Sequence, residues 1–113
     1  MIVCANPSAQ FDSYQTEIEE AVLEVMRSNR YVLGEEVASL EKEFADYIET
    51  TSAIGVANAT DAIELALRAL GVGLGDEVIT VSHTAVATIA AIEATGADTV
   101  LVDVEPEEYH LNP

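Results

Sequence analysis

The sequence has very few basic residues and almost no cysteine. Only four of its 113 residues are Lys or Arg, against 21 Asp and Glu, so the formal net charge is −17. A surface of this sign repels the phosphate backbones that nucleic-acid-binding proteins neutralise with Lys and Arg. We therefore expect no nucleic acid partner. The single cysteine, Cys4, cannot form an internal disulfide, and we interpret it as a small apolar residue rather than a nucleophile.

Long hydrophobic runs are also missing. No apolar stretch reaches the roughly 18 residues that a membrane-spanning helix needs, and residues 1–4 lack the basic start of a signal peptide. These absences predict a cytoplasmic chain with no membrane partner. A hydrophobic content of 50% in 113 residues supports one modest core, which means a single domain or part of one.

The acidic residues gather in two runs, residues 17–24 and 35–43, on segments with helical periodicity. The first predicted helix is capped by Asp12 or Ser13, and the second follows residues 31–34. Each carries apolar residues at spacings of three and four: Tyr14, Ile18, Val22, Val25 and Met26 in the first, and Val37, Leu40, Phe44, Tyr47 and Ile48 in the second. The acidic runs are then solvated helix faces. Capture of a metal ion by these runs is the alternative.

From residue 53 onward the pattern changes to alternating strands and helices. The sequence predicts strands at residues 53–57, 77–81 and 99–104, and helices at residues 62–70 and 85–94. The strands are apolar on both faces, which is typical of a parallel sheet covered by crossover helices. The predicted fold class is therefore α/β, with two leading helices followed by β-α-β-α-β.

The glycine string at residues 71–75 resembles a nucleotide-binding loop but stands in the wrong place. A dinucleotide fingerprint follows a strand and opens a helix, whereas this string follows a predicted helix and precedes a predicted strand. We interpret the glycines as a helix end followed by a tight turn. A dehydrogenase-like nucleotide binder therefore has little support.

The segment Asn58-Ala59-Thr60-Asp61 has the order that the glycine string lacks. It follows a predicted strand and opens a predicted helix, where unpaired backbone N–H groups and the helix dipole favour an anion. Thr60 offers a hydroxyl, and Ala59 is small enough to let the backbone approach a ligand. The alternative is that Asn58 or Thr60 only caps the helix. Position along the chain does not decide between them.

Longer stretches carry a resemblance to a known family. The sequences "YVLGEEVASLEKEFADYI", "GVANATDAIELALRALGVGLGDEVITVSHTAVATIAAI" and "GADTVLVDVEPEEYHLNP" follow one another across nearly the whole chain. They contain N-x-T-D-A, G-D-E-V-I, T-x-x-A-T and V-D-V-x-P in that order, with a tyrosine and N-P behind. This arrangement resembles the DegT-DnrJ-StrS family of sugar aminotransferases, which use pyridoxal 5′-phosphate.

The resemblance implies both a fold and an activity. Members are similar to aspartate aminotransferase, with a large α/β domain, a smaller C-terminal domain and a dimer whose active sites lie at the subunit interface. They transfer an amino group, usually from glutamate, to the keto group of a nucleotide-linked sugar. The products serve amino-sugar synthesis, for example of lipopolysaccharide or other surface polysaccharides and of secondary metabolites. The Ser82-His83-Thr84-Ala85 variant suggests an enzyme of 3-amino-deoxysugar synthesis.

The resemblance also implies roles for individual residues. Ala59 and Thr60 match the small residue and the threonine that bind the cofactor phosphate, while Asp61 is expected to be structural. Many members place an aromatic residue at the position of Ala85, where its ring lies against the cofactor ring. We expect His83 to take over that role. The alternative is a loop histidine bonded to the backbone.

One lysine is present, Lys42, and it does not match the family's Schiff-base lysine, which lies much further along the chain. The resemblance therefore predicts that residues 1–113 are part of the large cofactor-binding domain, without the small domain, and are inactive alone. Uncovered strand edges and apolar faces predict a homo-oligomer or a rearranged assembly. The alternative is a non-catalytic acidic interaction or regulatory module derived from the same fold.

Overall fold

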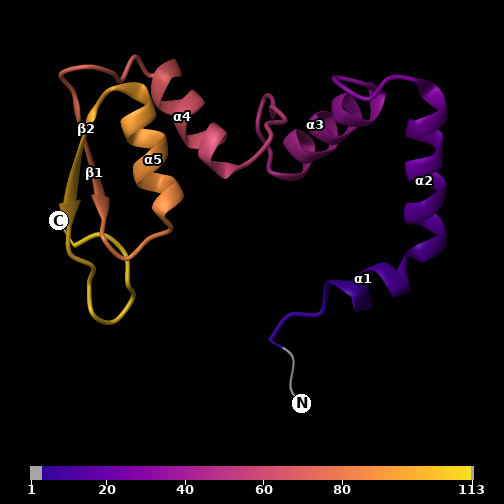
Figure 1. The fold of residues 1–113 in the computed structure, drawn as a ribbon, viewed down its shortest axis with the longest axis horizontal. Helices are drawn as coiled ribbons and strands as arrows, with labels where there is room; N and C mark the ends of the chain where they lie inside the picture. The colour runs from indigo at the N-terminus through magenta and orange to yellow at the C-terminus, as the bar shows by residue number, and fades with distance from the viewer. Residues whose placement is uncertain (1–3, 113) are drawn as a thin grey trace. The chain divides into compact units, whose positions relative to one another are not determined.

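The computed structural model describes residues 4–112, which divide after Gly55 into two compact units (Figure 1). The first unit contains three helices, α1 (Pro7–Ser13), α2 (Gln15–Ser28) and α3 (Glu35–Tyr47). The second unit contains α4 (Ala59–Ala69), β1 (Glu77–Val81), α5 (Val86–Thr95) and β2 (Asp98–Val102). Helices followed by alternating helices and parallel strands confirm the predicted α/β class.

The start of the first unit differs from the prediction. Asp12 and Ser13 do not cap a helix; they lie in the last turn of α1, which begins with Pro7 at a position where proline is favoured. The hydroxyl of Ser13 donates a hydrogen bond to the carbonyl oxygen of Ala9, 2.8 Å away. Tyr14, with φ −125° and ψ 21°, separates α1 from α2. The predicted apolar face of α2 exists, but no residue of α2 is buried.

Helix α3 begins directly after Gly34, as predicted. A Cβ atom at Gly34 would lie 2.9 Å from the carbonyl oxygen of Arg30, so the chain needs glycine there. Glu35 and Glu36 occupy the first turn, where negative charge is favourable to the helix dipole. Ala45 is the buried residue of α3, with 6% of its surface exposed.

The predicted strand at residues 53–57 is not formed. A strand needs a neighbouring backbone to pair with, and none of the described residues pairs with this segment. Instead, the amide of Gly55 donates to the Glu41 carboxylate at 2.7 Å, and 80% of the Ile54 surface is exposed. The apolar residues of this segment predicted a buried strand. The described chain provides no neighbouring strand that could pair with the segment.

The second unit is built around one parallel strand pair. β1 and β2 pair in register from Glu77 with Asp98 to Val81 with Val102. α5 packs on both strands, and α4 packs against α5. The two strands and α5 lie within two residues of their predicted bounds, while α4 starts three residues earlier than predicted, at Ala59.

The buried core of the second unit is small. Its buried residues all lie in or just after α5: Ala91, Ile92, Thr95 and Ala97. The hydroxyl of Thr95 donates to the carbonyl of Ile92 at 2.7 Å, which satisfies the buried polar atom. Outside this core, Ile79 and Leu101 of the sheet remain 58% and 53% exposed. The predicted self-association rests on such surfaces and stays a prediction.

The glycine string after α4 ends the helix, as predicted. Gly71 has φ +82°, and the amides of Gly71 and Val72 donate to the carbonyls of Arg68 and Leu67 at 3.0 Å each. These are the two hydrogen bonds of a Schellman motif, which needs a left-handed residue at the position of Gly71. The string is therefore a helix cap and not a nucleotide-binding loop.

Replacing Gly71 with alanine is expected to lower the free energy of unfolding by about 1 kcal/mol, because alanine resists the left-handed conformation. No heavy atom lies within 4 Å of the added Cβ, so the backbone alone carries the cost. Gly73→Ala is the matched control, since Gly73 has negative φ and its Cβ would meet Thr95 at an ordinary 3.5 Å. Urea denaturation followed by circular dichroism compares the two variants, and equal losses would contradict this account.

Within residues 4–112, no helix has the length and apolar character that crossing a membrane requires.

Candidate functional site

The candidate anion site lies at the start of α4, and Asn58 is the cap of this helix. Asn58 is extended, with φ −162°, and its side-chain oxygen accepts a hydrogen bond from the amide of Asp61 at 3.0 Å. Its side-chain nitrogen donates to the Asp61 carboxylate at 3.1 Å. The two residues thus bond each other reciprocally, much as in a capping box. Asp61 has a structural role here, in line with the prediction.

The cap leaves two amides free at this helix end. Asn58 satisfies the N–H of Asp61, while the N–H groups of Ala59 and Thr60 have no hydrogen-bond partner among residues 4–112. The Thr60 hydroxyl has none in the same part of the chain. Ala59 is exposed and Thr60 is half-buried, so an anion can approach both. Capping by Asn58 and anion binding by the next two residues are therefore compatible.

His83 lies in the loop between β1 and α5, in the same unit as Ala59 and Thr60. It is exposed, and its ring packs against the ring of Tyr109, with centroids 5.7 Å apart and planes tilted by 36°. Within residues 4–112, neither a hydrogen bond nor a ring contact joins His83 to Ala59 or Thr60. The histidine thus stands as an exposed ring held by an aromatic neighbour, a contact that the sequence did not predict.

Lys42 is an exposed residue of α3, in the first unit. It belongs to a solvated helix face, as its acidic neighbours suggested. Neither acidic run contributes to a group with metal-ligand geometry in the part of the chain that the structure describes. The acidic side chains of both runs are exposed, apart from the half-buried Glu41, as expected of solvated helix faces.

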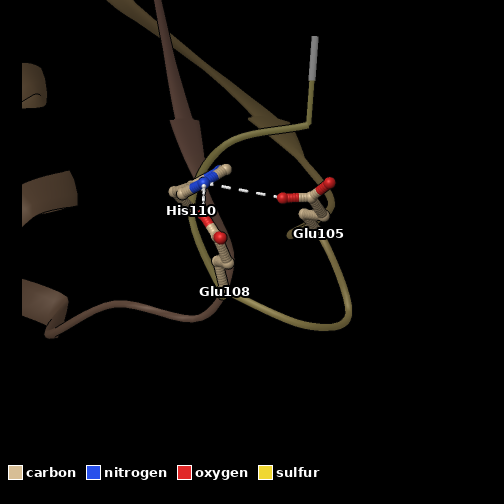
Figure 2. Close-up of side chains that lie close together, drawn as sticks. All are labelled: Glu105, Glu108 and His110. Atoms are coloured by element: carbon tan, nitrogen blue, oxygen red, sulfur yellow. Dashed lines mark hydrogen bonds and ion pairs between the residues drawn. The ribbon is translucent and has the colours of Figure 1, made fainter.

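A cluster near the end of the described chain escaped the sequence analysis. Glu105, Glu108 and His110 bring their side chains together in the loop after β2 (Figure 2). His110 Nε2 lies 2.6 Å from a carboxylate oxygen of Glu108 and 3.5 Å from one of Glu105. The signal in the sequence is the spacing E-x-x-E-x-H, which becomes meaningful only once the loop is known to fold back on itself.

The chain resembles solved enzymes along almost its whole length. DesV from S. venezuelae, crystallised with a ketimine intermediate, superposes on 96% of the chain with a TM-score of 0.92 and 44% identity, and the match covers 29% of DesV. The PLP form of the putative sugar aminotransferase Spr1654 from Streptococcus pneumoniae matches 84% of the chain, with a TM-score of 0.78 and 36% identity, over 24% of its own length. These are structures of pyridoxal-phosphate-dependent aminotransferases, which is the class that the fold defines.

The family assignment follows from the sequence match. Residues 12–113 match the DegT/DnrJ/EryC1/StrS aminotransferase family, and the chain belongs to this family. A curated relative, the dTDP-3-amino-3,4,6-trideoxy-alpha-D-glucose transaminase of Streptomyces venezuelae, is 48% identical over 102 residues. The match covers 90% of this chain and 26% of the relative, so the chain spans about a quarter of the relative's length.

Proposed function

We propose that the chain is the N-terminal part of an aminotransferase that transfers an amino group, usually from glutamate, to the keto group of a nucleotide-linked sugar. The relative that is 48% identical is itself a transaminase of a dTDP-linked 3-amino sugar. The observation that carries the proposal is the pair of free amides at Ala59 and Thr60, beside a free hydroxyl, at the helix end where the family binds its cofactor. The relatives described above give the non-catalytic module no support.

The residues at the start of α4 fit the phosphate of pyridoxal 5′-phosphate. Two unpaired N–H groups and one hydroxyl are donors, and phosphate oxygens are acceptors only. The positive end of the helix dipole adds a favourable potential, and Ala59 places no bulky side chain over the backbone. When bound, the cofactor would supply an electron sink for amino-group transfer. In this proposal Ala59 and Thr60 hold and orient its phosphate.

His83 is proposed to lie against the cofactor ring, because the usual aromatic position is occupied by Ala85. The contact with Tyr109 supports this role, since a ring held at a centroid distance of 5.7 Å has fewer orientations to lose when a ligand binds. Tyr109 would then position His83 without touching the ligand.

The proposal leaves the chain of 113 residues without a catalytic lysine. Lys42 lies on the exposed face of α3, and its position does not match the family's Schiff-base lysine. The described chain is therefore expected to bind but not to transaminate. Reduction with borohydride in the presence of the cofactor, followed by mass spectrometry, should label Lys42 no faster than it labels the amine of free lysine. Selective labelling of Lys42 would refute this assignment.

The test of the function begins with the coding sequence. If the reading frame continues past Pro113, the encoded enzyme is incubated with glutamate and a dTDP- or UDP-linked 3-keto sugar, and 2-oxoglutarate release is measured. The proposal predicts release that depends on the keto sugar and falls in a Thr60→Val variant. An enzyme with glutamate turnover but no response to any nucleotide-linked keto sugar would contradict the proposed substrate class. A frame that ends at Pro113 would contradict the proposal of an enzyme's N-terminal part.

A further inference from the structure

Three potential metal ligands meet in one closed loop after β2. The nearest ligand atoms of Glu105, Glu108 and His110 all lie within 4.8 Å of one another. They come from six consecutive residues, and Figure 2 shows the imidazole of His110 facing both carboxylates. This loop lies apart from α4, and none of its three ligands belongs to the proposed cofactor site.

The backbone holds the loop closed. The amide of Glu105 donates to the carbonyl of His110 at 2.9 Å, and the amide of Tyr109 donates to the carbonyl of Glu105 at 3.0 Å. Val104 and Leu111 form an antiparallel bridge across its base. The ends of the loop are thus fixed before any ligand arrives, which reduces the ordering cost of binding.

The spacing of the ligand atoms suits a small divalent ion. Zinc bonds of 2.0–2.2 Å at tetrahedral angles place ligand atoms about 3.3–3.6 Å apart. The distance from His110 Nε2 to the Glu105 carboxylate oxygen is 3.5 Å, which already suits a shared zinc ion. The distance from His110 Nε2 to the Glu108 carboxylate oxygen is 2.6 Å and must increase when the ion binds. The side chains of Glu108 and His110 are 72% and 60% exposed, so they can move this far without disturbing a core.

The charges and atom types select the kind of ion. Two carboxylates offer two negative charges, and in the described chain the ion pairs of Glu105 and Glu108 are with His110 alone. A divalent ion bound between the three side chains can neutralise both carboxylates. An imidazole nitrogen favours zinc and similar transition metals, whereas magnesium and calcium prefer oxygen ligands throughout.

We propose that Glu105, Glu108 and His110 form an open three-ligand site for a divalent transition-metal ion of the zinc type. Water completes the coordination, because Glu108 and His110 are exposed, Glu105 is only half-buried, and the described chain brings no fourth side chain to the group. The site does not depend on the proposed aminotransferase activity. Its occupancy would fix the loop that carries Tyr109, whose ring contacts His83.

The test titrates Zn²⁺ into the 113-residue chain by calorimetry and follows the two imidazoles by NMR. The expected result is one-to-one binding with a dissociation constant below about 100 µM, weaker than a four-ligand structural site. His110→Ala and Glu108→Gln should each weaken binding about tenfold or more. Glu107→Gln is the matched control, because it removes the same charge from the same loop but lies outside the ligand group.

The imidazole signals separate a site from diffuse attraction to a chain of net charge −17. Zn²⁺ should shift the His110 resonances much more than those of His83, which feels the site only through Tyr109, and Mg²⁺ at the same concentration should shift neither. Circular dichroism of each variant checks that its helices are retained. The proposal is overturned by any of three results: no saturable Zn²⁺ binding, equal losses in Glu107→Gln and Glu108→Gln, or an equal response to Mg²⁺.

Discussion

Replacing Ile92 with alanine is expected to lower the free energy of unfolding of the second unit by about 3 kcal/mol, within the range for large-to-small core substitutions. Ile92 is 1% exposed and is the largest fully buried side chain in the described chain. The other buried apolar residues of this unit, Ala91 and Ala97, have short side chains, which cannot extend to fill the space that the lost methyl groups leave. The small core therefore has no other side chain of this size to hold α5 in place.

The matched control is Val86→Ala, at the first residue of the same helix. Val86 is 80% exposed, so its loss should change the free energy of unfolding by no more than about 0.5 kcal/mol. Urea denaturation, monitored by circular dichroism at helical wavelengths, measures both variants. Equal effects at the two positions would mean that α5 does not pack as described.

Replacing Thr60 with valine is expected to weaken the binding of pyridoxal 5′-phosphate by about ten- to a hundredfold, because a hydrogen bond to a charged group is worth about 1.5–3 kcal/mol. Valine keeps the shape of threonine and removes only the hydroxyl. The Thr60 hydroxyl has no partner among residues 4–112, so its removal leaves no protein group unsatisfied. Fold stability should stay nearly unchanged while the affinity falls.

The control for this variant is Thr50→Val in the first unit, where the hydroxyl bonds the carbonyl of Ser52 at 3.1 Å. Fluorescence quenching by the cofactor, in about 0.15 M salt to screen the acidic surface, measures both variants. Binding that is equally strong in Thr60→Val and in the parent chain would remove Thr60 from the proposed site.

The sequence predicted most accurately the elements whose signals are local. β1 was placed at residues 77–81 by its apolar run, and Gly71, the first glycine of the string, ends α4 with positive φ. The segment at residues 53–57 carries the same apolar signal but forms no strand, because pairing depends on a neighbour that the described chain does not contain. A helix start at residue 12 or 13 was wrong since Pro7 opens an earlier helix.

For the candidate site too, the sequence predicted the residues that share a local pattern and missed the contacts that depend on tertiary structure. A polar turn between an apolar run and a helix pointed to Asn58, Ala59 and Thr60, and the structure adds which amide the cap satisfies. The contact of His83 with Tyr109 and the group around His110 depend on a loop that returns toward β1. The path of such a loop is set by tertiary structure and leaves no periodic pattern in the sequence, so these contacts could not be predicted.

The central claim is that the amides of Ala59 and Thr60 bind the phosphate of the cofactor. Titrating pyridoxal 5′-phosphate into the ¹⁵N-labelled chain, and comparing it with pyridoxal, which lacks the phosphate, tests this claim most directly. We predict that the amide shifts of Ala59 and Thr60 move most, and only with the phosphorylated compound. The largest shifts at the start of α3 or α5, or equal shifts with both compounds, would contradict it.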